Sequence, residues 1–381
     1  MRKVLVILEL KDTTTEAFKK GYAEWTTGIP LESRILYADQ VGEDDINWCD
    51  MVIAMRPNNP LSVGIAKTVK RSGKPYYVFF DDDLLNLEGT LGWRKKCTTA
   101  CLAEADLMIG VNPLLCEEYA AMTASGKYFL TKSPVDLDLI VPPGPAGDVV
   151  QFIYAAGRAH AVFFEKFIKP VLPEFLKEYE GRVHFTFVGV SPDVSDLGYD
   201  GSFTFVPLMP IAQYDEYMRS HHFDAGLSPL FDNHFSSRKY FNKFIEYSAN
   251  GIAGLYSDCL PYTFIVRDGV NGKLVGYDEG SWLEALKWAA DSGMTEKIAA
   301  IAQKQLREEF NCKSLAEAFE REVFSLPEGN VAKDIKYKKN MASYYAFLFA
   351  DRAKKLLLRL KDKGISGAID LVKTHIKDKN M

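Results

Sequence analysis

The sequence lacks the features that define several large classes of protein. Its six cysteines are scattered and include no C-x-x-C pair, which argues against a disulfide framework. Cys97 and Cys101 lie four apart on an expected helix, but without histidine partners we interpret them as packing residues rather than metal ligands. We find no internal repeat and no low-complexity tract. These absences favour a globular protein in a reducing compartment, which predicts the cytoplasm.

Long hydrophobic runs are also missing at the N-terminus. The first ten residues combine two basic side chains with a short apolar run and offer no small-residue cleavage site. The run is too short to cross a bilayer, so we interpret it as a first buried strand. A content of 47% hydrophobic and 25% charged residues is typical of soluble globular proteins.

Short apolar runs alternate with helix-like patterns along most of the chain. In the first part we expect strands over residues 4–8, 33–37, 51–55, 76–80 and 107–110, with helices such as 61–71 and 93–105 between them. In the second part we expect strands over residues 152–155, 183–188, 203–205, 225–227 and 252–256, with one helix over 161–179. Such alternation predicts parallel sheets with helices on both faces.

The segment VPPGPAG, residues 141–147, separates the two alternations and is expected to link two domains. The predicted fold class is therefore α/β, with two tandem, doubly wound Rossmann-like domains at residues 1–143 and 148–328. A helical tail follows at residues 329–381. Ligands of such open sheets bind beyond the carboxyl ends of the strands, so the cleft between the domains is the expected site.

The densest motif, KYFNKFIEYSANGIAGLYSD, begins at Lys239. Lys239, Lys243 and Glu246 are spaced i, i+4 and i+7, which places them on one face of a helix. Gly251 is expected to end this helix, and the apolar run 252–256 to form a buried strand. Lysines near a helix start suit phosphates, and a carboxylate one or two turns later suits sugar hydroxyls. This geometry predicts a nucleotide-sugar site.

The segment from Phe223 to Val275 resembles the C-terminal half of family-4 glycosyltransferases, which are retaining enzymes. The shared order is an apolar strand, Pro-Leu, a variable loop, K-x3-K-x2-E-Y-x-A-x-G, a strand that ends in Ser-Asp, and a Gly-Val-x-Gly turn. Here the flanking elements are residues 225–230, Ser257-Asp258 and residues 268–272. The resemblance implies the GT-B architecture, in which the N-terminal domain serves the acceptor and the C-terminal domain binds the nucleotide-sugar donor.

The resemblance also implies roles for individual residues of the donor domain. Gly157-Arg158 resemble the family's Gly-Arg, whose arginine faces the leaving diphosphate. Arg158 and Lys243 would stabilise the charge that builds there, and Lys239 would add to this or orient the loop. Glu246 resembles the family's ribose-binding glutamate, whose carboxylate accepts hydrogen bonds from both ribose hydroxyls. The alternative is that these residues are solvated surface charges.

One position departs from the family pattern. The first glutamate of the family's E-x7-E pair would fall at Arg238, so the loop that includes Ser237 is expected to replace it through backbone amides and hydroxyls. Backbone groups around Leu208 and Met209 are expected to recognise the base. His160 resembles the histidine of a Gly-x-x-His pattern in transferases that make surface polysaccharides; it would contact the sugar or the diphosphate, unless it is structural.

Asp81, Asp82 and Asp83 follow the expected strand 76–80. They suit three roles: orienting an acceptor hydroxyl in a GT-B enzyme, capping the next element, or binding Mn or Mg as the D-x-D motif of the GT-A fold. Because the donor motif lies in the other half of the chain, we expect the acceptor-side role and no requirement for a metal. Thr13 also falls beyond a strand end, where it is expected on the acceptor side; the alternatives are binding of the diphosphate or a helix cap.

The tail is strongly basic within an acidic protein. From residue 331 onward 13 Lys and Arg face 5 Asp, a net charge of +8, whereas the whole chain carries -5. An apolar stripe with steps of three and four runs along the expected helix through Tyr345, Phe349, Ala353, Leu356 and Leu360. Such stripes are usually core, but basic amphipathic helices also bind anionic lipid. We expect residues 342–360 to pack partly on the body and residues 361–381 to help hold the protein at the inner membrane face.

The sequence thus predicts a glycosyltransferase that moves a hexose from a nucleotide-diphosphate sugar to an acceptor hydroxyl. Retention follows from the resemblance, as does a place in surface polysaccharide or glycolipid assembly. The expected partners are the nucleotide sugar, a glycan or lipid-linked acceptor and an anionic membrane surface, but not nucleic acid; no cofactor is expected. Two alternatives stay open: a nucleotide-sugar-binding protein without catalysis, indicated by Arg238, and a metal-dependent GT-A-like transferase that uses Asp81 and Asp83.

Overall fold

The computed structural model of the protein describes residues 1–9, 13–87, 89–145, 147–157, 160–278, 280–324 and 335–378. The side chains of Thr13, Arg359 and residues 361–378 lie outside this description. Arg158, the side chain of Thr13 and the tail contacts expected of residues 361–381 therefore stay predictions.

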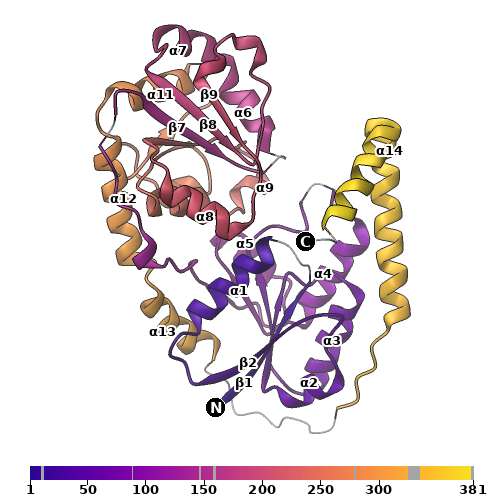
Figure 1. The fold of residues 1–381 in the computed structure, drawn as a ribbon. Coiled ribbons are helices and arrows are strands. Elements are labelled where there is room, and N and C mark those ends of the chain that lie inside the picture. The colour runs from indigo at the N-terminus through magenta and orange to yellow at the C-terminus, as the bar shows by residue number, and fades with distance from the viewer. Residues whose placement is uncertain are drawn as a thin grey trace.

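The described strands form two parallel sheets, one in each half of the chain (Figure 1). The first has the order β2-β1-β3-β4-β5-β6 and the second the order β12-β11-β10-β7-β8-β9. The first sheet consists of β1 (Arg2–Leu8), β2 (Leu31–Tyr37), β3 (Met51–Met55), β4 (Tyr76–Phe80), β5 (Leu107–Gly110) and β6 (Tyr128–Leu130). The second consists of β7 (Val150–Ala155), β8 (Val183–Val188), β9 (Phe203–Val206), β10 (Ala225–Ser228), β11 (Ala253–Ser257) and β12 (Lys273–Val275).

Helices cover both faces of each sheet. Those beside the first sheet are α1 (Thr13–Trp25), α2 (Glu43–Trp48), α3 (Pro60–Arg71), α4 (Gly92–Glu104) and α5 (Pro113–Ala120). Those of the second half are α6 (Ala161–Phe167), α7 (Leu172–Glu178), α8 (Ile211–Ser220), α9 (His234–Ser237), α10 (Asn242–Ala249), α11 (Ser281–Asp291) and α12 (Thr295–Glu309). The chain ends with α13 (Cys312–Val323) and α14 (Met341–Asp378).

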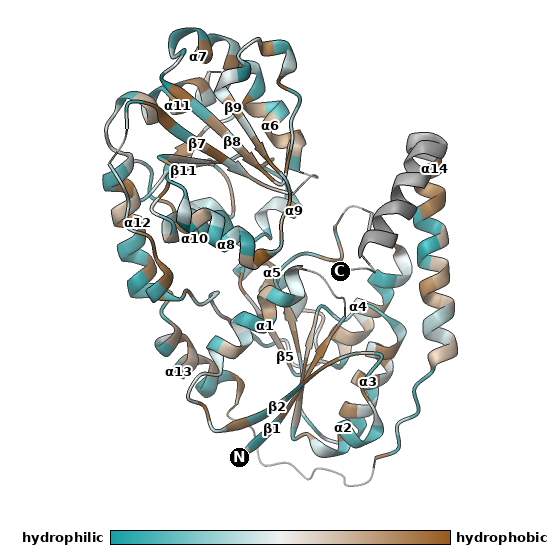
Figure 2. Ribbon diagram, viewed as in Figure 1, coloured by the Kyte–Doolittle hydropathy of each residue, from teal (hydrophilic) through white to brown (hydrophobic). Residues whose placement is uncertain are grey.

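The continuous apolar runs of the strands explain this layering. On β1, Val4 and Val6 belong to the hydrophobic cluster on one face, whereas Leu5 and Ile7 belong to the cluster on the other. All four side chains are buried, because side chains of a strand alternate between faces and both faces are covered by helices. In Figure 2 the strands β7 and β8 of the second sheet are likewise coloured mainly as hydrophobic.

All of the expected strands are present, but three details differ from the prediction. The edge strands β6 and β12 were not expected, since each has only three residues and their side chains are mostly partly or fully exposed. The single helix expected over residues 161–179 is interrupted by a short 3-10 turn at Lys169–Val171. Pro170 lies in that turn, and its ring and missing N–H are incompatible with a continuous helix.

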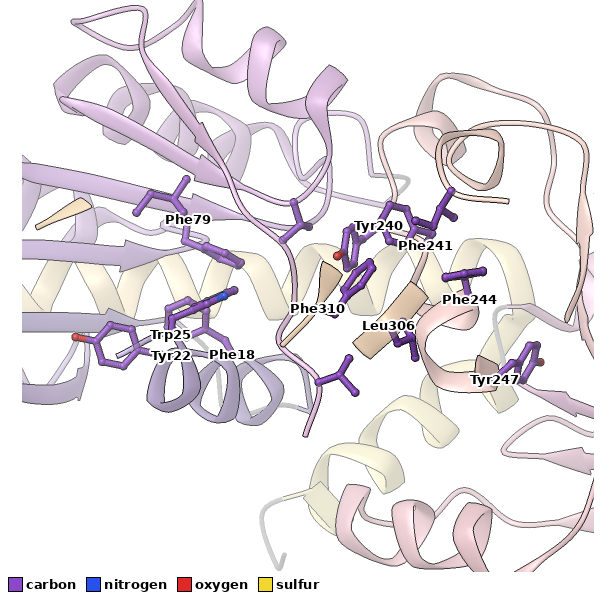
Figure 3. Close-up of a cluster of buried hydrophobic side chains, with 14 of the residues drawn as sticks. Phe18, Tyr22, Trp25, Phe79, Tyr240, Phe241, Phe244, Tyr247, Leu306 and Phe310 are labelled. Atoms are coloured by element: carbon purple, nitrogen blue, oxygen red, sulfur yellow. The ribbon is translucent and has the colours of Figure 1, made fainter. Parts of the chain in front are cut away.

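An aromatic-rich cluster of buried side chains joins the two halves of the protein (Figure 3). Phe18, Trp25 and Phe79 enter it from the first half, and Tyr240 and Phe244 enter it from the second. The chain also crosses back to the first half at α13, earlier than residue 329, where we had expected the crossing tail to begin. There the ring of Phe319 stacks on Trp25 with centroids 5.4 Å apart.

The described side chains of α14, up to residue 360, pack on the first domain from one face of the helix. Tyr344 packs on the hydrophobic cluster formed with α3 and α4, and Phe347 is buried. The expected apolar stripe points the other way: Tyr345 is 61% and Phe349 76% exposed. These two residues of the stripe are therefore not core, and the body-facing side of α14 instead buries Phe347 and Asp351.

In the part of the chain that the structure describes, none of the helices has the length and apolar character that crossing a membrane requires.

Candidate active site in the interdomain cleft

A cavity of about 780 Å³ opens between the two sheets. Its walls come from segments that follow the carboxyl ends of β3 and β4 in the first domain and of β7, β8 and β10 in the second, where ligands of open α/β sheets bind. Nine of the residues predicted from the sequence line this cavity: Asp81, Asp82, Gly157, His160, Leu208, Met209, Lys239, Lys243 and Glu246.

Two predicted residues do not line the cavity. Asp83 is completely buried and accepts hydrogen bonds from the Tyr119 hydroxyl at 2.9 Å and from the Asn86 side chain at 2.8 Å. Ser237 is 8% exposed, and its hydroxyl donates to the carbonyl oxygen of His234 at 2.8 Å. Asp83 therefore holds its own domain together and is not placed to orient an acceptor, and the hydroxyl of Ser237 is not placed to bind a donor.

The second domain contributes a cation, a carboxylate and a phenol that contact one another. The Lys243 ammonium lies 2.6 Å from Oε1 of Glu246, one turn further along α10, and the hydroxyl of Tyr214 on α8 donates to the same oxygen. Burial and the nearby Glu246 raise the pKa of Tyr214, which keeps it a hydrogen-bond donor. Tyr214 could not be predicted from the sequence, because it lies 32 residues before its partner.

Lys239 reaches the cavity from outside the helix. Helix α10 begins only at Asn242, so the prediction that both lysines and Glu246 share one helical face is wrong for Lys239. Its ammonium instead lies 3.8 Å from Oδ1 of Asp82, across the cleft. The side-chain amide of Asn112 donates to the carbonyl oxygen of Lys239 at 2.7 Å and fixes this segment on the first domain.

The first domain faces the donor side with two carboxylates held by one arginine. Nε of Arg56 donates to Oδ1 of Asp81 at 2.5 Å, and its Nη2 lies 3.5 Å from Oδ2 of Asp82. Arg56 has a φ of 47°, a left-handed conformation that is strained for a side chain of this size and often marks functional sites. Burial raises the pKa of Asp82, an effect that Lys239 and Arg56 oppose. Arg56 was not predicted, since its partners lie 25 residues away.

His160 lies at the start of α6, where the chain enters the cavity after β7. Burial, together with the nearby Lys239 and Lys243, lowers the pKa of His160 to about 4, so its imidazole is neutral at pH 7. Apart from its chain neighbours, no described residue lies within 4 Å of the position that a Cβ would take on Gly157, which lines the cavity. A ligand can therefore approach the backbone next to a neutral imidazole.

A second group of charged residues joins the domains beside the cavity. The imidazole of His234 lies 3.5 Å from Asp83 and 3.4 Å from Glu118, and Nε of Arg238 donates to Glu118 at 3.1 Å. Asp83, Glu118 and His234 offer three ligand atoms close enough for a metal ion. However, Arg238 already neutralises Glu118, and the two imidazole nitrogens face different carboxylates. The arrangement therefore fits an interdomain ion-pair network better than a metal centre.

No protein-family model and no curated protein matches this chain. Solved structures match along most of its length. HepE from Anabaena in complex with UDP superposes with a TM-score of 0.64 at 12% identity, over 85% of this chain and 100% of that one. Sucrose-phosphate synthase from Thermosynechococcus elongatus gives 0.59 at 13% identity, over 92% and 100%. The lipopolysaccharide outer core galactosyltransferase WaaB gives 0.57 at 15% identity, over 85% and 99%.

These similarities define the fold of the protein. It is a GT-B fold, with two tandem Rossmann-like domains and a helical C-terminal region, as the sequence predicted. The GT-A alternative is thereby excluded as a fold, and the burial of Asp83 removes one of the two carboxylates on which it depended.

Proposed function

We propose that the protein is a nucleotide-sugar-dependent glycosyltransferase that transfers a hexose to an acceptor hydroxyl with retention of configuration. The observation that carries this proposal is the convergence of the lysine and glutamate motif, Gly157 and His160 on one cavity opposite Asp81 and Asp82. Structures with the same fold contain UDP and UDP-glucose, which supports a nucleotide-sugar donor.

The donor would lie against the second domain. Lys243, at the N-terminus of α10, pairs with the diphosphate, and preorganised cations of this kind stabilise the negative charge that develops on the leaving group. Glu246 accepts hydrogen bonds from the ribose hydroxyls, and Tyr214 keeps its carboxylate oriented. Neutral His160 donates a hydrogen bond to the sugar or the diphosphate without adding a permanent charge.

The acceptor would lie against the first domain. Asp82 is the carboxylate of that wall whose pKa is raised by burial, and it lies opposite Lys239. An acceptor hydroxyl that donates to Asp82 would face the donor sugar across the cleft. Arg56 orients both Asp81 and Asp82 for this contact. No step of this mechanism uses a metal ion.

Incubation with UDP-, GDP- and ADP-linked sugars, with and without EDTA, tests the proposal. We expect slow nucleotide release from one donor class that EDTA does not inhibit. Binding of a donor without release would favour the alternative of a nucleotide-sugar-binding protein without catalysis. Release that EDTA abolishes would contradict the metal-independent mechanism, and failure to bind any donor would refute the proposal.

We further propose that the enzyme works at the cytoplasmic face of a membrane, on a glycan or lipid-linked acceptor of surface polysaccharide or glycolipid assembly. The support comes from the tail: its net charge is +8, and α14 turns the apolar side chains of Tyr345, Phe349 and Leu357 outward. A helix that combines an exposed apolar face with basic residues binds anionic lipid surfaces.

A further inference from the structure

A second cavity, of about 430 Å³, lies in the first domain directly beside the interdomain cleft. It is lined by residues at the end of β3, by residues that follow β1, β3 and β4, and by residues of α1, α4 and α14. Arg56 lines both this cavity and the cleft. Its volume falls in the range of small-molecule pockets, about 300–1,000 Å³. None of the predicted site residues whose side chains the structure describes lines it.

The carboxyl group of Glu9 lies in this cavity. Glu9 follows β1, and its carboxylate accepts hydrogen bonds from the side chains of Asn59 and Ser62 at the start of α3. The residue as a whole is partly exposed and lines the cavity, whereas its carboxyl group is enclosed by protein. This enclosure raises the pKa of Glu9 to about 7. At pH 7 the carboxyl is thus a hydrogen-bonding group that is only partly ionised.

The cations around the cavity are already paired. Nη1 of Arg94 donates to the Asn58 side chain at 2.5 Å, and its Nε and Nη2 donate to Asp351 of α14 at 2.8 and 2.9 Å. Lys355 lies 3.0 Å from the same Asp351. Arg56 is held by the two aspartates of the cleft. Among the described residues, these three cations therefore face three aspartates and Glu9, and they leave no excess positive charge to attract an anion.

Apolar side chains complete the lining. Met55, Leu84 and Leu87 provide a hydrophobic surface beside the polar groups of Glu9 and Asn58. A sugar ring presents the same combination, since its C–H groups pack on apolar side chains while its hydroxyls donate to carboxyl and amide oxygens. A phosphate or a uronic acid would need an unpaired cation, which the described lining does not offer.

We propose that this cavity binds an uncharged sugar ring of the acceptor, with its hydroxyls on Glu9 and Asn58 and its apolar face on Leu84 and Leu87. The inference rests on the proposed function, and it specifies the acceptor as one that carries a neutral hexose close to the reacting hydroxyl. The adjoining Arg56 marks where the acceptor passes from this cavity into the cleft.

Binding of methyl glycosides to the full-length protein tests the inference. Saturation-transfer NMR would compare the methyl glycosides of glucose, galactose and N-acetylglucosamine with methyl glucuronide, and donor hydrolysis would be measured with and without each glycoside. We expect a neutral glycoside to bind and to stimulate nucleotide release, with methyl glucuronide at least about tenfold weaker, the cost of one unpaired charge-assisted contact.

Two variants and two controls locate the binding site. Glu9→Gln replaces the carboxylate, and Leu87→Trp fills the cavity; each should weaken glycoside binding about tenfold and leave unstimulated donor hydrolysis unchanged. The controls are Glu32→Gln on β2 and Tyr128→Trp on the edge strand β6, both exposed and remote from the cavity lining. They should change neither quantity.

The possible failures are distinguishable. Absence of binding by every neutral glycoside, tighter binding of the glucuronide, or unchanged binding in both variants would overturn the inference. Absence of donor binding and hydrolysis would instead refute the proposed function, whereas the NMR measurement would still show whether the cavity takes a neutral sugar.

Discussion

Replacement of Lys243 by alanine tests the donor site directly. Lys243 lines the cleft at the N-terminus of α10, and its ammonium lies next to Glu246. The substitution removes the cation that we place on the diphosphate. It leaves Glu246 with the hydrogen bond from Tyr214, so the carboxylate is not stranded without a partner.

The structure separates the expected effect on rate from the effect on stability. Removing one preorganised donor from a transition-state oxyanion costs about 3 kcal/mol, or roughly a hundredfold in kcat. The ion pair itself contributes little to folding, because Lys243 and Glu246 are 25% and 24% exposed and helical pairs of this kind add roughly 0.5 kcal/mol. Lys243→Ala should therefore be a slow enzyme with a nearly normal Tm.

The assay is nucleotide release at saturating donor, followed beside thermal unfolding. Lys243→Arg preserves the charge and should recover part of the lost rate. Lys273→Ala is the matched control, since that lysine makes a similar ion pair, with Asp268 at 3.1 Å, but lies outside the cleft lining. If Lys243→Ala turns over within about threefold of the unmodified protein, the diphosphate does not bind where we place it.

Three further changes probe the acceptor side, the buried carboxyl and the tail. Asp82→Asn should reduce transfer to the acceptor, while calorimetry should show unchanged donor affinity. If Asp82→Asn instead lost donor affinity and manganese restored it, a metal role would be favoured. Asp83→Asn should lower the free energy of unfolding by roughly 1–3 kcal/mol. Burial raises the pKa of Glu9, so the free energy of unfolding falls as the pH rises from 4.5 through about 7. In urea titrations Glu9→Gln should therefore be more stable than the unmodified protein by up to about 3 kcal/mol at pH 8, but not at pH 4. Deletion of residues 361–381, or Phe349→Ser, should weaken co-sedimentation with anionic vesicles and leave donor hydrolysis intact. If the full-length protein does not co-sediment with such vesicles even at low salt, the tail does not bind membranes and its role is structural.

The fold was predictable because its main signals are local. A fully buried parallel strand is a continuous apolar run, and runs such as residues 4–8 and 51–55 can be recognised without any knowledge of their neighbours. The short strands β6 and β12 carry too few residues for this signal. The break at Pro170 also has a local cause, but the apolar periodicity on either side of it concealed the interruption.

The candidate site was only half predictable, and the division follows sequence distance. Lys243 and Glu246 belong to one short motif, whereas Arg56 acquires its role only when β3 and β4 pair and bring Asp81 beside it. The role of Arg94 is even harder to predict from the sequence, because its partner Asp351 lies 257 residues later on α14. Side chains that are oriented by distant partners leave no pattern in the sequence.

The structure explains the role of Arg238, which departs from the family pattern. In the family that the sequence resembles, a glutamate at this position lies near the donor sugar; here the guanidinium turns away from the cavity and donates to Glu118 of the first domain at 3.1 Å. Asn112 fixes the same segment by donating to the carbonyl oxygens of Ser237 and Lys239. In the family pattern this loop would contact the donor sugar through a carboxylate. Here the same loop instead joins the two domains. Recognition of the donor sugar that we propose would then fall to groups of the second domain that line the cleft, such as His160 and Lys239.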